Sequence, residues 1–328
     1  MNKNKARNRV LIAALFAVFI VLAGSREFVA FMVDWLFFRE VGYGAVFQKT
    51  FSAKLFTGLA FGAAAFLVIF INLRIAARHA YALAGLHPLW ERVPQLQNID
   101  LDRVMGWISL LVSFFAFVFA LPIGAQYWEQ ALLFLNSVPA HLADPLFGKD
   151  ISFYLFTYPF IDEVNTLVRS LIVVAALLTV PIYFVRGGIV LMGSLFTVEP
   201  GVKRHLAALV SLYLLSLSFS FVLDRYGLLT TEHGVLYGAS YTDVHVRLLM
   251  LSVMSVLAVV AAIVVPVFAS RGSLGVPLLA LGVLMGAYIL GLQVYPSTMQ
   301  SFKVSPNEIV LERPYIANHI KFTRFGYG

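Results

Sequence analysis

The chain has 328 residues, of which 60% are hydrophobic and only 12% are charged. Soluble globular proteins carry about 25% charged residues, and the mean hydropathy of +0.85 is correspondingly high. This composition excludes an ordinary soluble domain and indicates an integral membrane protein. The chain has no cysteine, which excludes disulfides, cysteine zinc sites, thiolate catalysis and iron–sulfur ligation.

Several stretches are long and apolar enough for helices that cross about 30 Å of hydrocarbon, which takes about 20 residues each. The predicted spans are Val10–Met32, Phe51–Leu73, Met105–Gly124, Val164–Phe184, His205–Val222, Leu248–Ala269 and Leu274–Leu292. The first span follows a basic segment and has an alternative interpretation as a cleaved signal peptide. The sequence therefore predicts an all-α fold, a polytopic transmembrane helical bundle of about seven spans.

Lysines and arginines gather in alternate connections between these spans. The basic residues are Lys3, Lys5, Arg7 and Arg9 before the first span, Arg74, Arg78, Arg92 and Arg103 between the second and third, Arg186, Lys203 and Arg204 after the fourth, and Arg271 after the sixth. By the positive-inside rule the N-terminus is cytoplasmic and the C-terminal tail lies outside. We expect a multi-pass protein of the cell (plasma) membrane, with the lipid bilayer as a partner and no nucleic-acid partner.

Two glycine pairs and a serine-rich span predict how the helices pack. Gly58 with Gly62, and Gly282 with Gly286, have the G-x-x-x-G spacing that allows close helix contact. The fifth span contains the serines Ser211, Ser216, Ser218 and Ser220. These hydroxyls can bond the backbone and pack helices, or they can line a polar path. Packing is the favoured interpretation.

The connections assigned to the outer side carry amphipathic and aromatic segments. "AQYWEQALLFLNSV" places Tyr127, Trp128 and Leu132 on one helix face, as in an interfacial helix. "DPLFGKDISFYLFTYPF", residues 144–160, combines turn residues with an aromatic run too short to cross a bilayer. It is predicted to be a re-entrant or surface-lying piece.

Four ordered motifs identify a resemblance to a known family. "WLFFREVGYGAVF", "DPLFGKDISFYLFTYPF", "GASYTDVH" and "PNEIVLERPYIANHIKFTRFGYG" together resemble uncharacterised protein family 0182, a group of bacterial integral membrane proteins. The resemblance implies about seven N-terminal spans followed by a large extracytoplasmic domain, and it implies no biochemical activity. The chain has His319 where the family pattern more often has asparagine.

A charged cluster lies directly before the sixth span. Asp243, His245 and Arg247 follow the acidic and basic pair Asp224 and Arg225 in the same connection. We interpret the cluster as a helix cap and headgroup anchor, in which Thr242 or Asp243 accepts exposed amides and the basic side chains meet lipid headgroups or another ligand.

Two alternatives to this interpretation stay open. In an extended loop, Asp243 and His245 would point to one side and, with His233, bind zinc or manganese. They would otherwise act as an acid–base pair. No metal-ligand or nucleophile motif accompanies them, so the sequence predicts no catalytic residue, metal site or cofactor, and an enzyme is the less favoured class.

The tail changes character after the last span. We predict a transmembrane bundle over 1–295 and an extracytoplasmic tail over 296–328, the tail being the start of an outer domain and alternating short strand and helix. Its charged residues would form salt bridges in a surface that docks an extracytoplasmic protein partner. They are Glu308, Glu312, Arg313 and Arg324.

Two functions follow from these features. The first is a non-enzymatic membrane anchor or scaffold for an extracytoplasmic domain or envelope complex, because ionisable residues are scarce at the middle of the predicted spans. The second is a transporter or lipid-handling protein, which rests on the serine-rich fifth span and on the charged cluster outside it. This second function predicts a cavity bounded by spans five and six.

Overall fold

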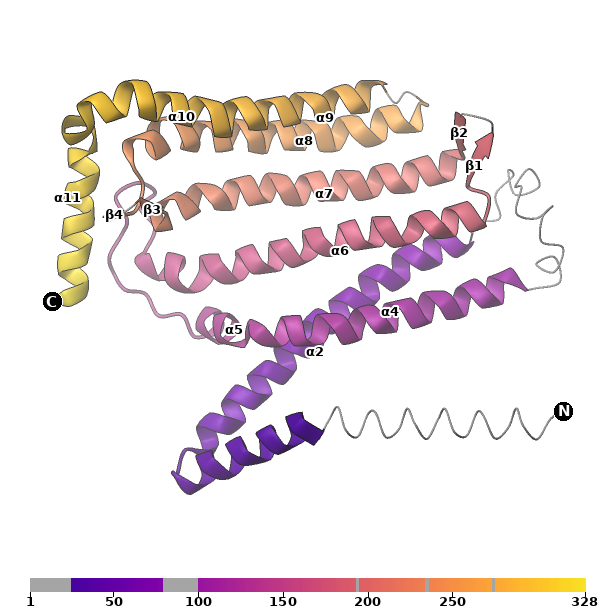
Figure 1. Cartoon of the computed structure of the whole chain (residues 1–328), viewed down its shortest axis with the longest axis horizontal. Coiled ribbons are helices and arrows are strands. Elements are labelled where there is room, and N and C mark those ends of the chain that lie inside the picture. The colour runs from indigo at the N-terminus through magenta and orange to yellow at the C-terminus, as the bar shows by residue number, and fades with distance from the viewer. Residues whose placement is uncertain (1–24, 79–99, 193–194, 234–235, 273–274) are drawn as a thin grey trace.

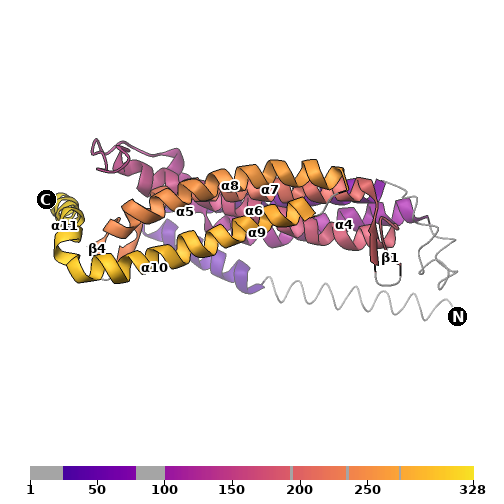
Figure 2. The ribbon, with the colours of Figure 1, turned by 90° about the horizontal axis from the view of Figure 1, so that it is seen from above.

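A computed structural model describes residues 25–78, 100–192, 195–233, 236–272 and 275–328. The long helices of the described chain are α2 (Gly44–Arg78), α4 (Leu101–Gln126), α6 (Tyr158–Val185), α7 (Pro200–Gly227), α8 (Leu248–Ser270) and α9 (Gly275–Tyr288). Most run side by side along the long axis of the molecule, and α2 crosses α4 obliquely (Figure 1). The view from above shows the same elongated bundle (Figure 2).

Six helices of the described residues are long and apolar enough to cross a membrane. They cover the predicted spans from the second to the seventh, the seventh from Gly275 onward. Most of the first predicted span, Val10–Met32, lies outside the described residues. The described part begins at residue 25 and belongs to a helix over residues 25–40. Large apolar side chains such as Phe119, Leu177 and Ile263 are 70%, 67% and 60% exposed on the helices. An apolar outer surface of this kind is what a membrane protein presents to lipid.

Glycine decides the closest helix contact. A Cβ on Gly58 would lie 2.8 Å from the Leu121 carbonyl oxygen, and one on Gly62 would lie 2.9 Å from the Phe117 ring. These glycines therefore let α2 approach α4, as the G-x-x-x-G spacing predicts. The prediction for the second pair is wrong within the described residues, because nothing lies within 4 Å of such an atom on Gly282 or Gly286.

The serines of α7 join neighbouring helices, which confirms the packing interpretation. The Ser211 hydroxyl donates to the Ala262 carbonyl at 2.6 Å, and the Ser218 hydroxyl donates to the Ser255 carbonyl at 2.9 Å. Ser216 donates to the Asn165 side chain of α6 at 2.8 Å. The hydroxyl groups of these three serines therefore form hydrogen bonds between helices.

The aromatic run after "DPLFGKD" is not the predicted re-entrant piece. A π-helical turn, η3 (Phe153–Thr157), leads directly into α6, so the two form one helical stretch from Phe153 to Val185. Pro159 lies inside this stretch, directly after the π-helical turn, and its missing N–H removes one intrahelical hydrogen bond there. The run is the first part of a long helix whose hydrophobic stretch the proline obscured.

The tail is helical rather than a strand–helix alternation. After α9 the chain continues through η6 (Ile289–Val294), α10 (Tyr295–Met299), η7 (Gln300–Val304), η8 (Ser305–Asn307) and α11 (Glu308–Tyr327). The predicted short strands of the tail are therefore wrong, because the structure has a helix at every position from Ser305 to Tyr327. The boundary at residue 295 stays a prediction.

One end of the bundle gathers most of the irregular structure, and we call it the α11 end. There α11 turns across the bundle beside the hairpin of β3 (Glu232–His233) with β4 (Leu236–Tyr237) (Figure 1). The same end carries the short helix α5 (Trp128–Leu135) and the π-helical turn η5 (Asp243–Arg247). The opposite end carries the hairpin of β1 (Ile189–Met192) with β2 (Leu195–Val198), in which Ile189 pairs with Val198.

Candidate functional site

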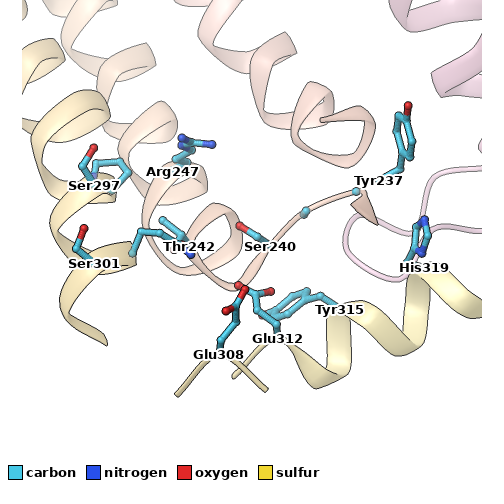
Figure 3. Close-up of a pocket in the computed structure, with 14 residues that line it drawn as sticks. Tyr237, Ser240, Thr242, Arg247, Ser297, Ser301, Glu308, Glu312, Tyr315 and His319 are labelled. Carbon is cyan, nitrogen blue, oxygen red and sulfur yellow. The ribbon is translucent and has the colours of Figure 1, made fainter. Parts of the chain in front are cut away.

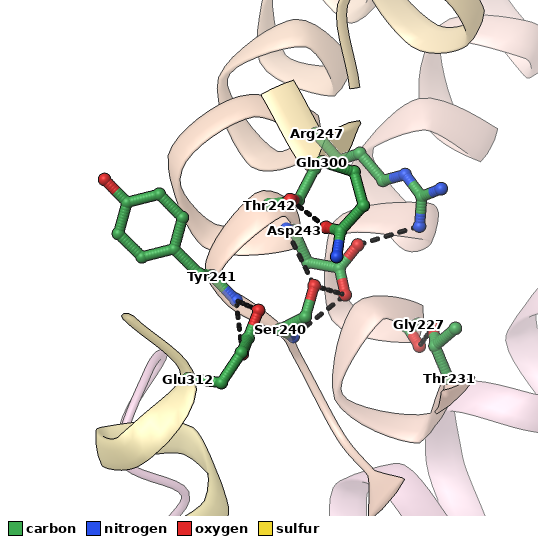
Figure 4. Close-up of polar contacts among 9 residues, drawn as sticks. All are labelled: Gly227, Thr231, Ser240, Tyr241, Thr242, Asp243, Arg247, Gln300 and Glu312. Atoms are coloured by element: carbon green, nitrogen blue, oxygen red, sulfur yellow. Dashed lines mark hydrogen bonds and ion pairs between the residues drawn. The ribbon is translucent and has the colours of Figure 1, made fainter. Parts of the chain in front are cut away.

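The charged cluster before α8 is organised by a capping box. The helix begins at Tyr241, and Ser240 is its N-cap. The Asp243 backbone N–H donates to the Ser240 hydroxyl at 3.2 Å, while the Asp243 carboxylate accepts the Ser240 backbone N–H at 2.9 Å. This reciprocal pattern satisfies amides that a helix start leaves free. The predicted helix cap is confirmed, with Asp243 at the third helical position (Figure 4).

Arg247 completes this cap from one turn further along the helix. Its Nη1 lies 2.8 Å from Asp243 Oδ1, and the Asp243 side chain is fully buried while that of Arg247 is 39% exposed. A buried carboxylate needs such a partner, and its negative charge also suits the positive end of the helix. Arg247 therefore neutralises the cap and still presents part of its guanidinium to the surroundings.

His245 takes no part in the cap. Its Nδ1 lies 3.0 Å from the Tyr241 carbonyl oxygen, and its ring stacks on the Tyr241 ring with centroids 4.0 Å apart. The segment is helical rather than extended, so Asp243 and His245 point to different sides. The acid–base pair therefore does not form. In the part of the chain that the structure describes, no group of three or more His, Asp or Glu residues is placed to hold a metal ion.

A long-range contact adds α11 to this site. Both carboxylate oxygens of Glu312 accept the Tyr241 backbone N–H, at 3.1 and 3.0 Å. Glu312 is buried, at 8% exposure. The Thr242 hydroxyl donates to the Gln300 side-chain oxygen at 2.6 Å. The first amides and side chains of the α8 helix thus bind both η7 and α11 (Figure 4).

The remaining predicted site residues are not brought into this cluster. Asp224 and Arg225 lie in the last turn of α7, and Arg225 Nε is buried without a hydrogen-bond partner among the described residues. Glu308, Arg313 and Arg324 are exposed on α11. Within the described chain no ion pair joins these three to Glu312 or to one another, so the predicted salt bridges of the tail are not formed there.

Two cavities adjoin this cluster. The first, of about 480 Å³, is lined mainly by polar side chains, among them Arg247, Gln300, Glu308 and Glu312. Figure 3 shows Arg247 and Ser297 on one side of it and the α11 residues Tyr315 and His319 on the other. The second cavity, of about 570 Å³, is lined mainly by apolar side chains such as Leu155 and Phe322. Both volumes fall in the range of small-molecule sites.

The "DPLFGKD" loop forms one wall of the second cavity. The Asp144 carboxylate is buried and accepts the backbone N–H groups of Leu146, Phe147 and Lys149 at 2.8, 2.6 and 2.6 Å, and the Tyr154 hydroxyl at 2.9 Å. These bonds satisfy the carboxylate and fix the loop.

A second carboxylate closes the same loop. Asp150 accepts the Ala140 backbone N–H at 3.0 Å and the Ser152 backbone N–H at 2.8 Å. Hydrogen bonds from the Ser152 side chain and backbone, followed by the one from Ala140, lower the pKa of Asp150 to about 2. Hydrogen bonds that stabilise the ionised form have this effect. The loop is therefore held by hydrogen bonds to the carboxylates of Asp144 and Asp150 as well as by apolar packing.

Several residues of the site were missed in the sequence. The S-x-x-D spacing of Ser240 and Asp243 was a detectable capping-box signal. Gln300 and Tyr241 gave none, because their partners lie 58 and 71 residues away. The role of Asp144 was visible only as an Asp-Pro turn.

These observations define the class first: a helical membrane protein whose α11 end combines a capped helix with two adjoining cavities. The chain belongs to the Uncharacterised protein family (UPF0182), which matches residues 10–328. It is 40% identical over 294 residues to a UPF0182 protein of Pelobacter propionicus, an alignment that covers 90% of this chain and 33% of that protein.

Other bacteria have similar proteins. A UPF0182 protein of Geobacter sp. (strain M21) is 37% identical over 95% of this chain and 35% of its own length, and one of Thermobifida fusca is 33% identical over 98% and 32%. The chain thus spans about a third of the length of these relatives. No solved structure matches it.

Proposed function

We propose that this chain is a non-enzymatic scaffold of the plasma membrane, which docks an extracytoplasmic protein domain on α11. The observation that carries the proposal is the exposed apolar surface of α11. Ile309, Val310 and Tyr327 are 83%, 74% and 92% exposed, and exposed apolar groups that gather on one element are typical of interaction surfaces. The relatives extend well beyond the third that this chain matches, and such additional sequence is the occupant we propose.

The buried side of α11 supports the same proposal. Glu312 holds the helix to the bundle through the Tyr241 N–H, whereas Ile309 and Val310 lie in the exposed first turn of the same helix. A helix that docks a partner must be attached to the rest of the protein and must expose side chains to the partner. Glu312 attaches α11 to the bundle, and Ile309 and Val310 are exposed.

The orientation is part of the proposal and has its own test. Basic residues in alternate connections support a cytoplasmic N-terminus and an extracytoplasmic α11 end. Because the chain has no cysteine, single cysteines can be placed by Val310→Cys and Ser270→Cys. A membrane-impermeant maleimide should label Val310→Cys in intact spheroplasts and Ser270→Cys only after lysis. The reverse pattern would contradict the proposed orientation.

Docking itself is tested by photo-crosslinking from the same positions. A benzophenone maleimide on Val310→Cys should give a protein adduct in native membranes, whose identity mass spectrometry establishes. Ile263→Cys is the matched control, because Ile263 is also apolar and exposed but lies on α8. Lipid adducts alone at both positions would refute the scaffold function.

A second candidate function is transport or lipid handling, and Arg169 is the observation that favours it. Arg169 lies in the outer part of the predicted span Val164–Phe184, where its Nη1 donates to the Ser220 hydroxyl. Charge within a membrane helix is expensive and often serves transport. Asn165 also donates to Ser220, at 2.8 Å, so the group joins α6 to α7.

The two functions predict different results for Arg169→Gln. Proton flux into proteoliposomes that contain a pH-sensitive dye should be unchanged if the polar group only joins helices. A flux that the wild type supports and Arg169→Gln abolishes, at equal incorporation, would establish transport and displace the scaffold function.

A further inference from the structure

The two cavities at the α11 end share part of their walls. Tyr237, Gly238, Ala239, Tyr315 and His319 line both of them. One wall is therefore the short segment that follows β4, and the other is the inner face of α11. We call the first cavity the polar chamber and the second cavity the apolar chamber. Two chambers that meet in this way fit a molecule with a polar head and an apolar chain.

The polar chamber offers a cation and an anion at separate places. Arg247 uses Nη1 for Asp243, and its other guanidinium N–H groups have no hydrogen-bond partner among the described residues. Such guanidinium N–H groups can donate hydrogen bonds to phosphate oxygens. Glu308 lines the same chamber from α11 and makes no hydrogen bond within the described chain, so it can accept the N–H groups of an ammonium.

The apolar chamber offers space for a hydrocarbon chain. Leu155, Leu229, Val244 and Phe322 contribute to its wall. Asp144 also borders it, but its carboxylate already accepts three backbone N–H groups and the Tyr154 hydroxyl. The wall thus carries no unsatisfied charge from this loop, and burying a chain there costs no charge desolvation.

We propose that the α11 end binds one amine-containing zwitterionic phospholipid. Its phosphate lies at Arg247, its ammonium at Glu308 and one acyl chain in the chamber lined by Leu155 and Phe322. The inference goes beyond the scaffold function and does not depend on it, because Ile309 and Val310 line neither cavity.

The first experiment measures binding of fluorescent lysophosphatidylethanolamine to the purified full chain in a detergent that contains no amine. Lysophosphatidylglycerol is the comparison, since it keeps the phosphate and the chain but lacks the ammonium. We expect saturable binding that is about tenfold tighter for the ethanolamine lipid, the order of one charge-assisted hydrogen bond. Equal affinity for the two lipids would overturn the zwitterion assignment.

A variant pair tests the polar chamber. Glu308→Gln should weaken binding of lysophosphatidylethanolamine about tenfold and leave lysophosphatidylglycerol unchanged. Glu129→Gln is the matched control, because Glu129 is an exposed glutamate of α5 that lines neither chamber. The same small effect from both variants would overturn the role of Glu308.

A second pair tests the apolar chamber. Thr323→Trp adds a large ring at its wall and should weaken binding of the lipid about tenfold, whereas Ala317→Trp adds the same ring to an exposed position of α11 outside both chambers. Thermal unfolding of each variant establishes that it is folded. Undiminished binding by a folded Thr323→Trp variant would show that the chamber holds no chain.

Competition distinguishes a lipid from a free phosphate compound. Glycerophosphoethanolamine carries the head without the chain, and sodium phosphate carries neither the chain nor the amine. We expect both to displace the labelled lipid only at concentrations at least about a hundredfold higher than an unlabelled lysophospholipid, since chain burial contributes to affinity. Displacement by sodium phosphate at similar concentration would overturn the lipid assignment.

Discussion

The Glu312 carboxylate caps the Tyr241 backbone N–H with both oxygens, at 3.1 and 3.0 Å, across 71 residues of sequence. Tyr241 begins the helix that leads into α8, so its amide belongs to the group that a helix start leaves unsatisfied. The residue that satisfies it comes from α11. The position of α11 and the start of α8 are thereby coupled.

This coupling predicts that Glu312→Ala loosens α11. Loss of a hydrogen bond to a charged acceptor costs about 1.5–3 kcal/mol, and the Tyr241 amide would lose its cap. Hydrogen–deuterium exchange of residues 308–327 and of the Tyr241 amide should accelerate. Arg313→Ala is the control, because Arg313 is exposed in the same helix and lines neither cavity. Equal protection in both variants would show that the contact does not hold α11.

The capping box predicts graded losses of stability. Ser240→Ala should lower the free energy of unfolding by about 1 kcal/mol, the usual effect of losing an N-cap. Asp243→Ala should cost more, about 3 kcal/mol, since it also removes the charged partner of Arg247. Thermal unfolding in mild detergent measures both.

His245→Ala tests whether His245 contributes to the helix cap that Ser240 and Asp243 form. His245 is exposed and stacks on Tyr241 without touching the carboxylate of Asp243. A surface substitution of this kind should change stability by about 0.5 kcal/mol or less. A loss as large as that of Asp243→Ala would contradict the assignment of the cap.

The low pKa of Asp150 predicts an acid-sensitive loop. Its folded pKa of about 2 lies below the ordinary value of 3.8, so the ionised form stabilises the folded loop. This stabilisation is fully present above pH 3.8 and is lost as the pH falls towards 2. Pepsin should therefore cleave residues 137–152 faster at pH 2 than at pH 4.

The variant Asp150→Asn isolates this effect from general acid denaturation. Asparagine cannot ionise, so the variant should be cleaved at similar rates at both pH values once the rates are normalised to a distant site. If wild type and variant show the same pH dependence, another group controls the loop.

Two helix glycines, Gly124 and Gly282, predict opposite results when each is replaced by alanine. A Cβ on Gly124, in the α4 segment that faces α2, would lie 2.4 Å from the Phe61 Cβ, whereas one on Gly282 of α9 would meet nothing within 4 Å. Gly124→Ala should destabilise by about 1–3 kcal/mol through overpacking. Gly282→Ala should be neutral or stabilise by about 0.5–1 kcal/mol, because alanine favours the helix. A destabilising Gly282→Ala would instead reveal a partner on α9.

Much of the membrane architecture followed from the sequence. A continuous apolar stretch of about 20 residues has few other stable conformations in a membrane, and the described residues of the second to the seventh predicted span are all helical. The helix cap at Asp243 was also predictable, because a capping box depends on residues three apart. Local patterns failed at residues 153–160 and 308–327, where aromatic and β-branched residues obscured helices.

The sequence by itself determined most of the long apolar helices, since hydrophobicity and helix formation depend largely on neighbouring residues. Only the tertiary structure decided that Gly58 and Gly62 pack while Gly282 and Gly286 stand open, although both pairs have the same spacing. It alone joined Glu312 to Tyr241 and set a polar chamber beside an apolar one. The physical reason is that these features depend on contacts between segments far apart in the chain, and no local pattern specifies which distant groups will meet.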